Sequence, residues 1–339
     1  MKVVEVIKPG ELKISEKPMP TSPKSGEVMV KIKAAGLCGS DIHIYHGKNA
    51  FATFPRILGH EVSGEICQVG ENVEGFKVGD RVAVDNVISC GKCYACRMNR
   101  PNVCKNLKVL GVHVDGGFCE YMNISVENTY KLPESISYEM AATIEPYSIA
   151  AEATDRGRLT STDDVLICGA GPLGLMLVEV AKSVGARVVI MDVVEDRLKK
   201  ALECGVDMII NPKHMDVTKS IMEFTNGEGA NLVFEATGNL GVFELSISEL
   251  VSQAGRVVVL GFPNEYAKVK PSDIMKRELD VLGSRVNNKK FPQVLEWMDK
   301  KQVNPSKIIS HTFSFEDIEE AMKLYEENPN EVYKIVLTF

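Results

Sequence analysis

The chain has 339 residues, of which 45% are hydrophobic and 25% charged. This composition excludes a disordered or low-complexity protein, and the length corresponds to roughly two domains of about 150 residues. The net charge of -7 argues against nucleic acid and anionic membranes as partners and favours a small molecule. No signal-peptide-like segment occurs at the N-terminus and no stretch is long and apolar enough to cross a bilayer, so we expect a cytoplasmic protein.

The first third of the chain predicts short strands. Residues 27–33 alternate apolar and polar side chains, residues 81–84 form a second apolar run, and glycines punctuate the interval between them. This pattern is typical of a small β-barrel.

Three separated segments within the first 146 residues carry metal-ligating residue types. They are Cys38 in Cys38-Gly39-Ser40-Asp41, His60-Glu61 after Gly59, and Glu145 before Pro146. One thiolate, one imidazole and one carboxylate leave a fourth coordination place open, as a catalytic zinc ion requires. Taken singly, each residue also fits an ordinary structural role, as a buried thiol, a hydrogen-bonded histidine or an acid at a helix N-terminus.

A second group of cysteines has the spacing C-x2-C-x2-C-x7-C and comprises Cys90, Cys93, Cys96 and Cys104. Four thiolates close a tetrahedral shell around zinc, so this pattern predicts a structural site. Disulfides and an iron–sulfur cluster are the alternatives. The basic residues of this segment either offset the thiolate charge or belong to a nucleic-acid-binding knuckle.

From about residue 160, strand and helix patterns alternate. Apolar runs at 164–168, 187–191, 231–235 and 255–260 predict buried strands, and 175–184 and 241–252 predict helices. We therefore expect an α/β fold with a doubly wound parallel sheet. A helix at 315–327 and a strand at 333–337 are expected to pack back on the first domain.

The turn after the first of these strands is a dinucleotide-binding fingerprint, G-x-G-x-x-G, in which Gly169, Ala170, Gly171, Pro172, Leu173 and Gly174 open a helix. Asp192 ends the second strand, where a carboxylate accepts hydrogen bonds from a ribose and repels a 2′-phosphate. The sequence thus predicts NAD rather than NADP. Arg197 is expected to contact the ribose or adenine, with a surface salt bridge as the alternative.

In order and spacing, these motifs resemble the zinc-dependent medium-chain dehydrogenase/reductase family over essentially the whole chain. The resemblance implies a GroES-like barrel domain at 1–149 and 287–339, a Rossmann domain at 150–286, an active site in the interdomain cleft, and a homodimer or homotetramer. It further implies two Zn²⁺ ions per chain, a structural one and a catalytic one held by Cys38, His60 and either Glu61 or Glu145.

The resemblance also implies a proton relay through Ser40 and His43, with a passive surface role as the alternative for His43. Glu145-Pro146 is similar to the polyol and threonine dehydrogenases. Arg285 matches the arginine with which sorbitol dehydrogenases contact polyol hydroxyls, and its guanidinium also suits a carboxylate; a structural salt bridge is the alternative. The segments that contain Arg285 and His113 (283–285 and 111–118) resemble those of sugar-acid dehydrogenases such as the ones that oxidise L-galactonate. Ile44 stands where sorbitol dehydrogenases carry an aromatic residue. A hexonate or polyol is therefore the expected substrate, and L-threonine 3-dehydrogenase and sorbitol or L-iditol 2-dehydrogenase are the alternative activities. A non-catalytic relative is a further alternative, which Cys38 and His60 oppose.

Overall fold

The computed structural model describes residues 1–339 and divides them into two compact units. Unit 1 consists of Met1–Ser148, Asn287–Lys300 and Ile309–Phe339, and unit 2 of Ile149–Val286 and Lys301–Ile308. Residues 301–308 thus group with unit 2, whereas the sequence-based division assigns them to the first domain.

Unit 1 is built mainly from β-strands in three sheets. The largest has the order β10-β6-β5-β3-β18-β17, with β9 paired to β3 as well; a second has the order β2-β1-β4; the third pairs β7 with β8. The strands of the first sheet are β3 (Glu27–Leu37), β5 (Glu61–Val69), β6 (Arg81–Val84), β9 (Tyr121–Ser125), β10 (Thr129–Lys131), β17 (Ile309–Ser314) and β18 (Lys334–Thr338). The others are β1 (Lys2–Lys8), β2 (Glu11–Glu16), β4 (Arg56–Ile57), β7 (Val87–Ile88) and β8 (Lys108–Val109).

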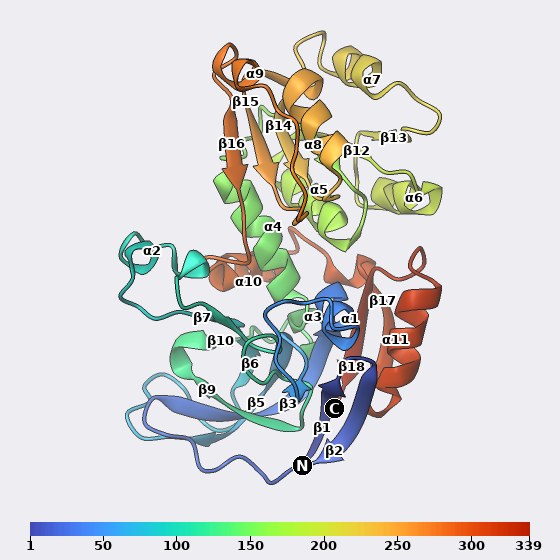
Figure 1. Cartoon of the computed structure of the whole chain (residues 1–339). Helices are drawn as coiled ribbons and strands as arrows, with labels where there is room; N and C mark the ends of the chain where they lie inside the picture. Colours follow the sequence, from blue (N-terminus) through green and yellow to red (C-terminus); the bar gives the residue numbers. More distant parts are fainter. The chain divides into compact units, whose positions relative to one another are not determined.

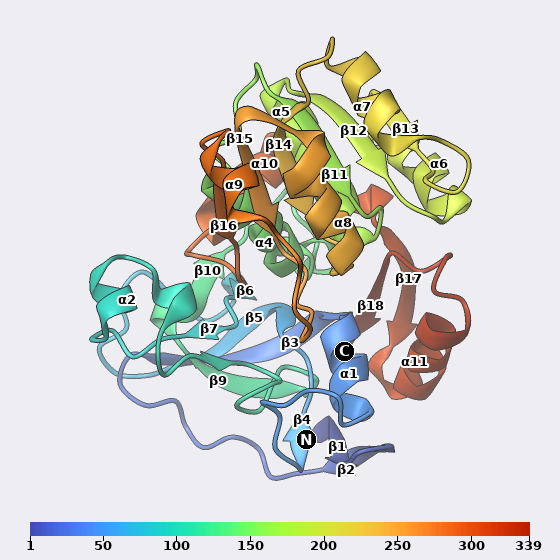
Figure 2. The same ribbon diagram turned by 45° about the horizontal axis from the view of Figure 1, so that its top comes forward.

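Strand β3 organises the large sheet. One of its edges pairs with β5 along most of its length, and its other edge pairs first with β9 and then with β18. Val28, Val30 and Ile32 are buried in the apolar core of the unit, which explains the alternation seen in the sequence. Figure 2 shows β3 and β18 side by side close to α1 (Gly39–Tyr45), which follows β3 directly. The end of β3 is therefore the point where three strands and a helix meet.

The remaining helices of unit 1 are short. They are α2 (Tyr94–Arg97), α3 (Tyr138–Ala141), α10 (Phe291–Asp299) and α11 (Ile318–Glu327), with 3-10 segments at Pro101–Val103, Val126–Asn128 and Phe315–Asp317. Helix α11 packs beside β17 (Figure 1), so the C-terminal segment completes this unit, as expected. Helix α4 (Ile144–Arg156) begins in unit 1 and continues into unit 2.

Unit 2 is a doubly wound parallel sheet with the order β13-β12-β11-β14-β15-β16. In chain order its strands run 3-2-1-4-5-6, the order of dinucleotide-binding folds. The strands are β11 (Asp164–Cys168), β12 (Arg187–Met191), β13 (Met208–Ile210), β14 (Ala230–Glu235), β15 (Val251–Val259) and β16 (Asp280–Gly283). The helices are α5 (Pro172–Val184), α6 (Glu195–Glu203), α7 (Val217–Phe224), α8 (Leu240–Leu245) and α9 (Pro271–Met275), with a 3-10 turn at Pro305–Lys307.

The strands and helices predicted from the sequence are present in both units, and the α/β fold class is confirmed. One boundary was wrong: the helix expected at 241–252 consists of α8 and a π-helical turn, Ser246–Leu250, and β15 already begins at Val251. Val251 pairs with Ala230 of β14, so the sheet ladder overrides the helical pattern there. None of the helices has the length and apolarity that a membrane span requires.

Candidate metal and dinucleotide sites

The end of β3 gathers the first candidate metal site. Cys38 follows β3 and precedes α1, while His60 and Glu61 stand at the start of β5, where Glu61 pairs with Gly36 of β3. The ligand atoms of Cys38, His60 and Glu61 lie within 4.8 Å of one another, and both His60 and Glu61 are buried. Residues that are 22 positions apart in the sequence thus converge because two strands are adjacent.

Asp41, fully buried in α1, fixes two of the segments that carry these ligands. Its Oδ2 accepts a hydrogen bond from the backbone N–H of Cys38 (3.0 Å), and its Oδ1 accepts one from the N–H of Gly59 (3.3 Å). Oδ1 also lies 3.6 Å from Nδ1 of His60. Burial alone would lower the pKa of His60, but Asp41 raises it well above the ordinary value. A carboxylate beside Nδ1 orients the ring so that Nε2 is presented to a metal.

Lys334, the first residue of β18, is a component of this site that the sequence analysis missed. Its Nζ lies 2.6 and 2.8 Å from the two carboxylate oxygens of Glu61, and both side chains are buried. Burial would lower the pKa of Lys334, but the charge of Glu61 outweighs this effect and raises it. The sequence did contain a signal for this role, because Lys334 opens an otherwise apolar run of residues. A lysine that is buried in such a strand needs a charged partner.

Glu145 lies at the start of α4, outside the set of three mutually close ligands. The amide Nδ2 of Asn86 donates a hydrogen bond to its Oε1 (2.7 Å), and both residues are buried. Burial, together with the charge of Glu61, raises the pKa of Glu145 to about 7, although His60 acts in the opposite direction. These interactions show that Glu145 lies close enough to His60 and Glu61 to respond to their charges.

Asn86, which the sequence analysis also missed, is held by its neighbours in the loop between β6 and β7. The side chain of Asn128 donates to the carbonyl oxygens of Asp85 (3.0 Å) and Val87 (2.8 Å). The carbonyl of Asn86 accepts a hydrogen bond from the N–H of Leu110 (3.1 Å). The loop backbone is therefore fixed on both sides of the residue that contacts Glu145.

The expected relay residues both lie on α1. Ser40 Oγ is 3.4 Å from Nε2 of His60, whereas His43 is exposed on the surface of the same helix. The expected substrate residues are His113 in unit 1 and Arg285 in unit 2. His113 accepts a hydrogen bond from the N–H of Val109 (3.2 Å) and stacks on Phe51.

The donor chemistry of the first site fits zinc. A thiol, an imidazole whose orientation a carboxylate controls, and two buried carboxylates are the ligand types of catalytic zinc sites. Nδ1 of His60 is buried and faces Oδ1 of Asp41 at 3.6 Å, slightly beyond hydrogen-bond distance.

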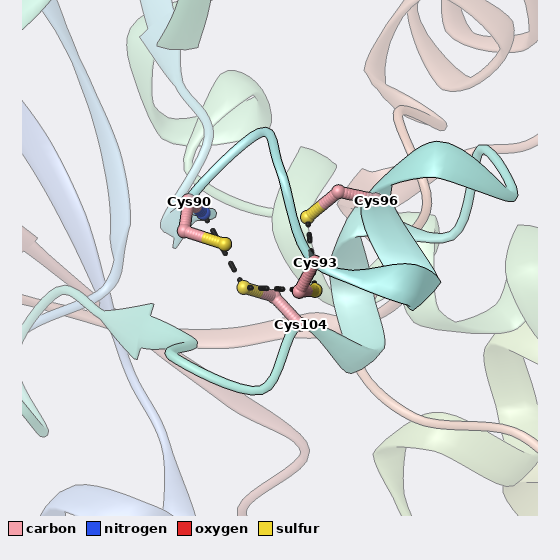
Figure 3. Close-up of side chains that lie close together, drawn as sticks. All are labelled: Cys90, Cys93, Cys96 and Cys104. Atoms are coloured by element: carbon pink, nitrogen blue, oxygen red, sulfur yellow. Dashed lines mark hydrogen bonds between the residues drawn. The ribbon is translucent and has the colours of Figure 1, made fainter.

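The four clustered cysteines form a second, separate site (Figure 3). The Sγ of Cys93 lies 3.5 Å from that of Cys96 and 3.8 Å from that of Cys104. A tetrahedron with metal–sulfur bonds of about 2.3 Å has edges of about 3.8 Å, so the arrangement fits zinc. Backbone N–H groups of Cys96 and Lys105 lower the pKa of Cys93 to about 6, which favours the thiolate. All nine cysteines are free of disulfides.

In unit 2, the predicted fingerprint connects β11 to α5. Gly169 has φ +104°, Gly171 is the N-cap of α5, and Pro172 occupies its first turn. A Cβ on Gly174 would lie 1.9 Å from the carbonyl oxygen of Gly169, so only glycine allows the helix to approach the strand this closely. The first turn of α5 thereby presents its backbone N–H groups at the carboxyl end of β11, which suits a pyrophosphate.

Asp192 follows β12 and supports the fingerprint loop directly. Its Oδ2 accepts a hydrogen bond from the N–H of Ala170 (2.7 Å), and its Oδ1 accepts one from the N–H of Val194 (2.9 Å). The carboxylate predicted to bind a ribose is therefore adjacent to the glycine turn. Leu173 lies in the first turn of α5, and Arg197 lies in α6.

Comparisons with known proteins match both units. The model of the alcohol dehydrogenase GroES-like domain matches residues 24–134, and that of the zinc-binding dehydrogenase matches residues 172–300. The starvation-sensing protein RspB of Escherichia coli K12 is 43% identical over 100% of this chain and 99% of its own. A crystal structure of the short chain alcohol dehydrogenase RspB from E. coli CFT073, complexed with NADH, has a TM-score of 0.95 and covers 100% of this chain and 99% of its own.

Two further relatives have names that specify substrates. L-threonine 3-dehydrogenase of Pyrococcus abyssi is 39% identical over 89% of this chain and 88% of its own. L-galactonate-5-dehydrogenase of E. coli K12 is 33% identical over 100% of this chain and 99% of its own.

Proposed function

Since the chain belongs to the zinc-binding dehydrogenase family, with an alcohol dehydrogenase GroES-like domain, we propose that it oxidises a secondary alcohol of a sugar acid or polyol with NAD⁺. The observation that carries this proposal is the buried set of Cys38, His60 and a glutamate, which offers a metal fewer protein ligands than it can bind. Such a set leaves a place for a substrate oxygen. The alcohol loses a hydride and a proton and becomes a carbonyl compound, and NAD⁺ becomes NADH.

Cys38 and His60 would hold the ion, together with Glu61 or Glu145. Zinc bound there would act as a Lewis acid that lowers the pKa of the alcohol hydroxyl. Asp41 keeps the His60 ring oriented, and Asn86 keeps the Glu145 carboxylate in place through its hydrogen bond. These residues would maintain the geometry of the ligand set during turnover.

The proton of the alcohol would leave through α1. Ser40, whose hydroxyl lies beside the ligand His60, would accept it while giving up its own hydroxyl proton. That proton would pass through the cofactor ribose to His43 on the exposed face of the helix, which would release it to solvent. Imidazole is the side chain that most readily exchanges a proton with solvent near neutral pH, which suits that step.

The nicotinamide cofactor would bind to unit 2 with its pyrophosphate on Gly169, Gly171 and Gly174. Asp192 supports the choice of NAD, because a carboxylate next to the glycine turn repels a 2′-phosphate. Arg197 would contact the adenosine half.

The substrate class rests on Arg285 and His113 and on the similarity to L-galactonate-5-dehydrogenase. A guanidinium pairs with a carboxylate through two parallel hydrogen bonds, which fits a hexonate. L-Threonine is the second candidate, because a relative of that name has 39% identity. We also propose that the protein is a homodimer or homotetramer, and that it is cytoplasmic, since four free thiols in one metal site need a reducing compartment.

NAD⁺ reduction across hexonates, polyols, L-threonine and simple alcohols tests this proposal, with NADP⁺ as the matched cofactor control. We expect turnover with a hexonate or polyol, a preference for NAD⁺, and loss of turnover after the weaker of two zinc ions is removed with a chelator. Turnover confined to L-threonine would favour the second candidate, and full turnover by the zinc-depleted enzyme would refute the mechanism. Light scattering on a size-exclusion column measures the oligomeric state.

A further inference from the structure

The two acidic residues near Cys38 and His60 have different partners. Both oxygens of Glu61 are engaged by the ammonium of Lys334, at 2.6 and 2.8 Å, whereas Glu145 receives one neutral amide N–H from Asn86 at 2.7 Å. Glu61 is nevertheless the carboxylate whose ligand atom lies within 4.8 Å of those of Cys38 and His60. A cation and a bound metal would therefore compete for the same carboxylate.

The charge balance of the site explains why a cation is needed beside the metal. A thiolate on Cys38 and carboxylates on Glu61 and Glu145 bring three negative charges, and a divalent ion supplies two positive ones. Lys334 supplies the third positive charge, and because its side chain is only 4% exposed, solvent screens this charge little. Asp41 is a further anion beside His60, but backbone N–H groups of Cys38 and Gly59 already compensate it.

We propose that Lys334 is a positioning residue that competes with the bound metal for the Glu61 carboxylate and so keeps one coordination place exchangeable for substrate. The inference rests on the proposed function, since it concerns the same metal. With Lys334 in place, Glu61 is a weak, displaceable ligand. Without it, Glu61 would turn fully to the metal, bind it more tightly and obstruct the place that a substrate oxygen needs.

The test combines K334M, E61Q and the K334M/E61Q double variant, with K182M as the matched control. Lys182 has the same two-oxygen geometry, with Nζ at 2.8 and 2.7 Å from the oxygens of Asp207, but this pair is partly exposed and lies in unit 2, so it controls for the loss of a lysine ion pair away from the metal. The readouts are the zinc dissociation constants from chelator competition, the visible spectrum of the cobalt-substituted protein, and kcat and KM. The four-cysteine site serves as an internal reference for zinc affinity.

K334M is expected to bind the catalytic zinc at least tenfold more tightly, with an altered cobalt spectrum and a lower kcat, while K182M keeps the wild-type values. Because Lys334 acts mainly through Glu61, its replacement by methionine should tighten zinc binding by a much smaller factor in the E61Q background than in wild type. The double variant contains no unpaired buried charge, so it can be compared directly with wild type if K334M or E61Q fails to fold. Because it lacks the Glu61 carboxylate, it should not bind zinc more tightly than wild type does.

Unchanged or weaker zinc binding in folded K334M would overturn the proposal, and so would a double variant that binds zinc tenfold more tightly than E61Q. If either variant gives such a result while the wild-type protein holds two zinc ions and oxidises an alcohol, the proposed function stands and only the role of Lys334 is refuted. A wild-type protein that holds only the four-cysteine zinc would instead refute the proposed function itself.

Discussion

Replacing Gly36 by alanine should displace the Glu61 carboxylate from Lys334. A Cβ at this position would lie 1.8 Å from Oε2 of Glu61 and 2.9 Å from its Cδ. To restore van der Waals contact, the carboxylate has to retreat by about 1.5 Å or more. Gly36 has no positive φ, so the alanine backbone itself is unstrained, and the whole effect should fall on Glu61.

The magnitude follows from the buried ion pair. Separating two buried partners costs about 3–5 kcal/mol. Alanine in place of glycine within a strand returns about 0.5–1 kcal/mol. We therefore expect G36A to lower the free energy of unfolding of unit 1 by about 2–4.5 kcal/mol.

The assay is urea unfolding followed by the fluorescence of the single tryptophan, Trp297, which lies in α10 of unit 1. Gly283 in β16 of unit 2 is the control for alanine in a strand, because a Cβ there meets no atom within 4 Å. Followed by circular dichroism, G283A should be as stable as wild type or up to about 1 kcal/mol more stable. In the background of E61A, only the Cβ of residue 61 remains, 3.0 Å from the added Cβ, so the G36A change should cost less than in wild type. A G36A protein as stable as wild type, or equal costs in both backgrounds, would contradict this reasoning.

Three other variants are informative. Burial raises the pKa of Asp85 from 3.8 to about 6, so folding favours the protonated carboxyl, and the free energy of unfolding falls by at most about 3 kcal/mol as the pH rises through this range. D85N should abolish this pH dependence, as measured by urea unfolding at pH 4 and pH 7.5. If D85N instead destabilises the protein equally at both pH values, the raised pKa of Asp85 is not the cause. G174A should weaken NADH binding at least tenfold in a fluorescence titration, because its Cβ would lie 1.9 Å from the carbonyl oxygen of Gly169, and leave the unfolding of unit 1 unchanged; undiminished binding would be incompatible with the assigned loop. C104S should lose one of two zinc ions in metal analysis, and retention of both would show that the cysteine cluster is not the structural site.

The sequence was sufficient where a local pattern carries the physical cause. The alternation in residues 27–33 and the apolar runs of the second half predicted strands because burial follows the period of the backbone. The spacing of Cys90, Cys93, Cys96 and Cys104 predicted a closed cluster because these residues lie within 15 positions of one another. The expected family, enzyme class and cofactor types were confirmed by comparison with known proteins, whereas the roles of individual site residues remain proposals.

Tertiary structure alone decided how the first metal site is supported. Lys334 meets Glu61 across 273 positions because β18 and β5 both pair with β3, and no local pattern encodes that adjacency. Asn86 reaches Glu145 because a separate residue, Asn128, fixes its loop. Ligands can be read from residue type and spacing, but the groups that orient and charge-balance them come from strand pairing, which only the folded chain specifies.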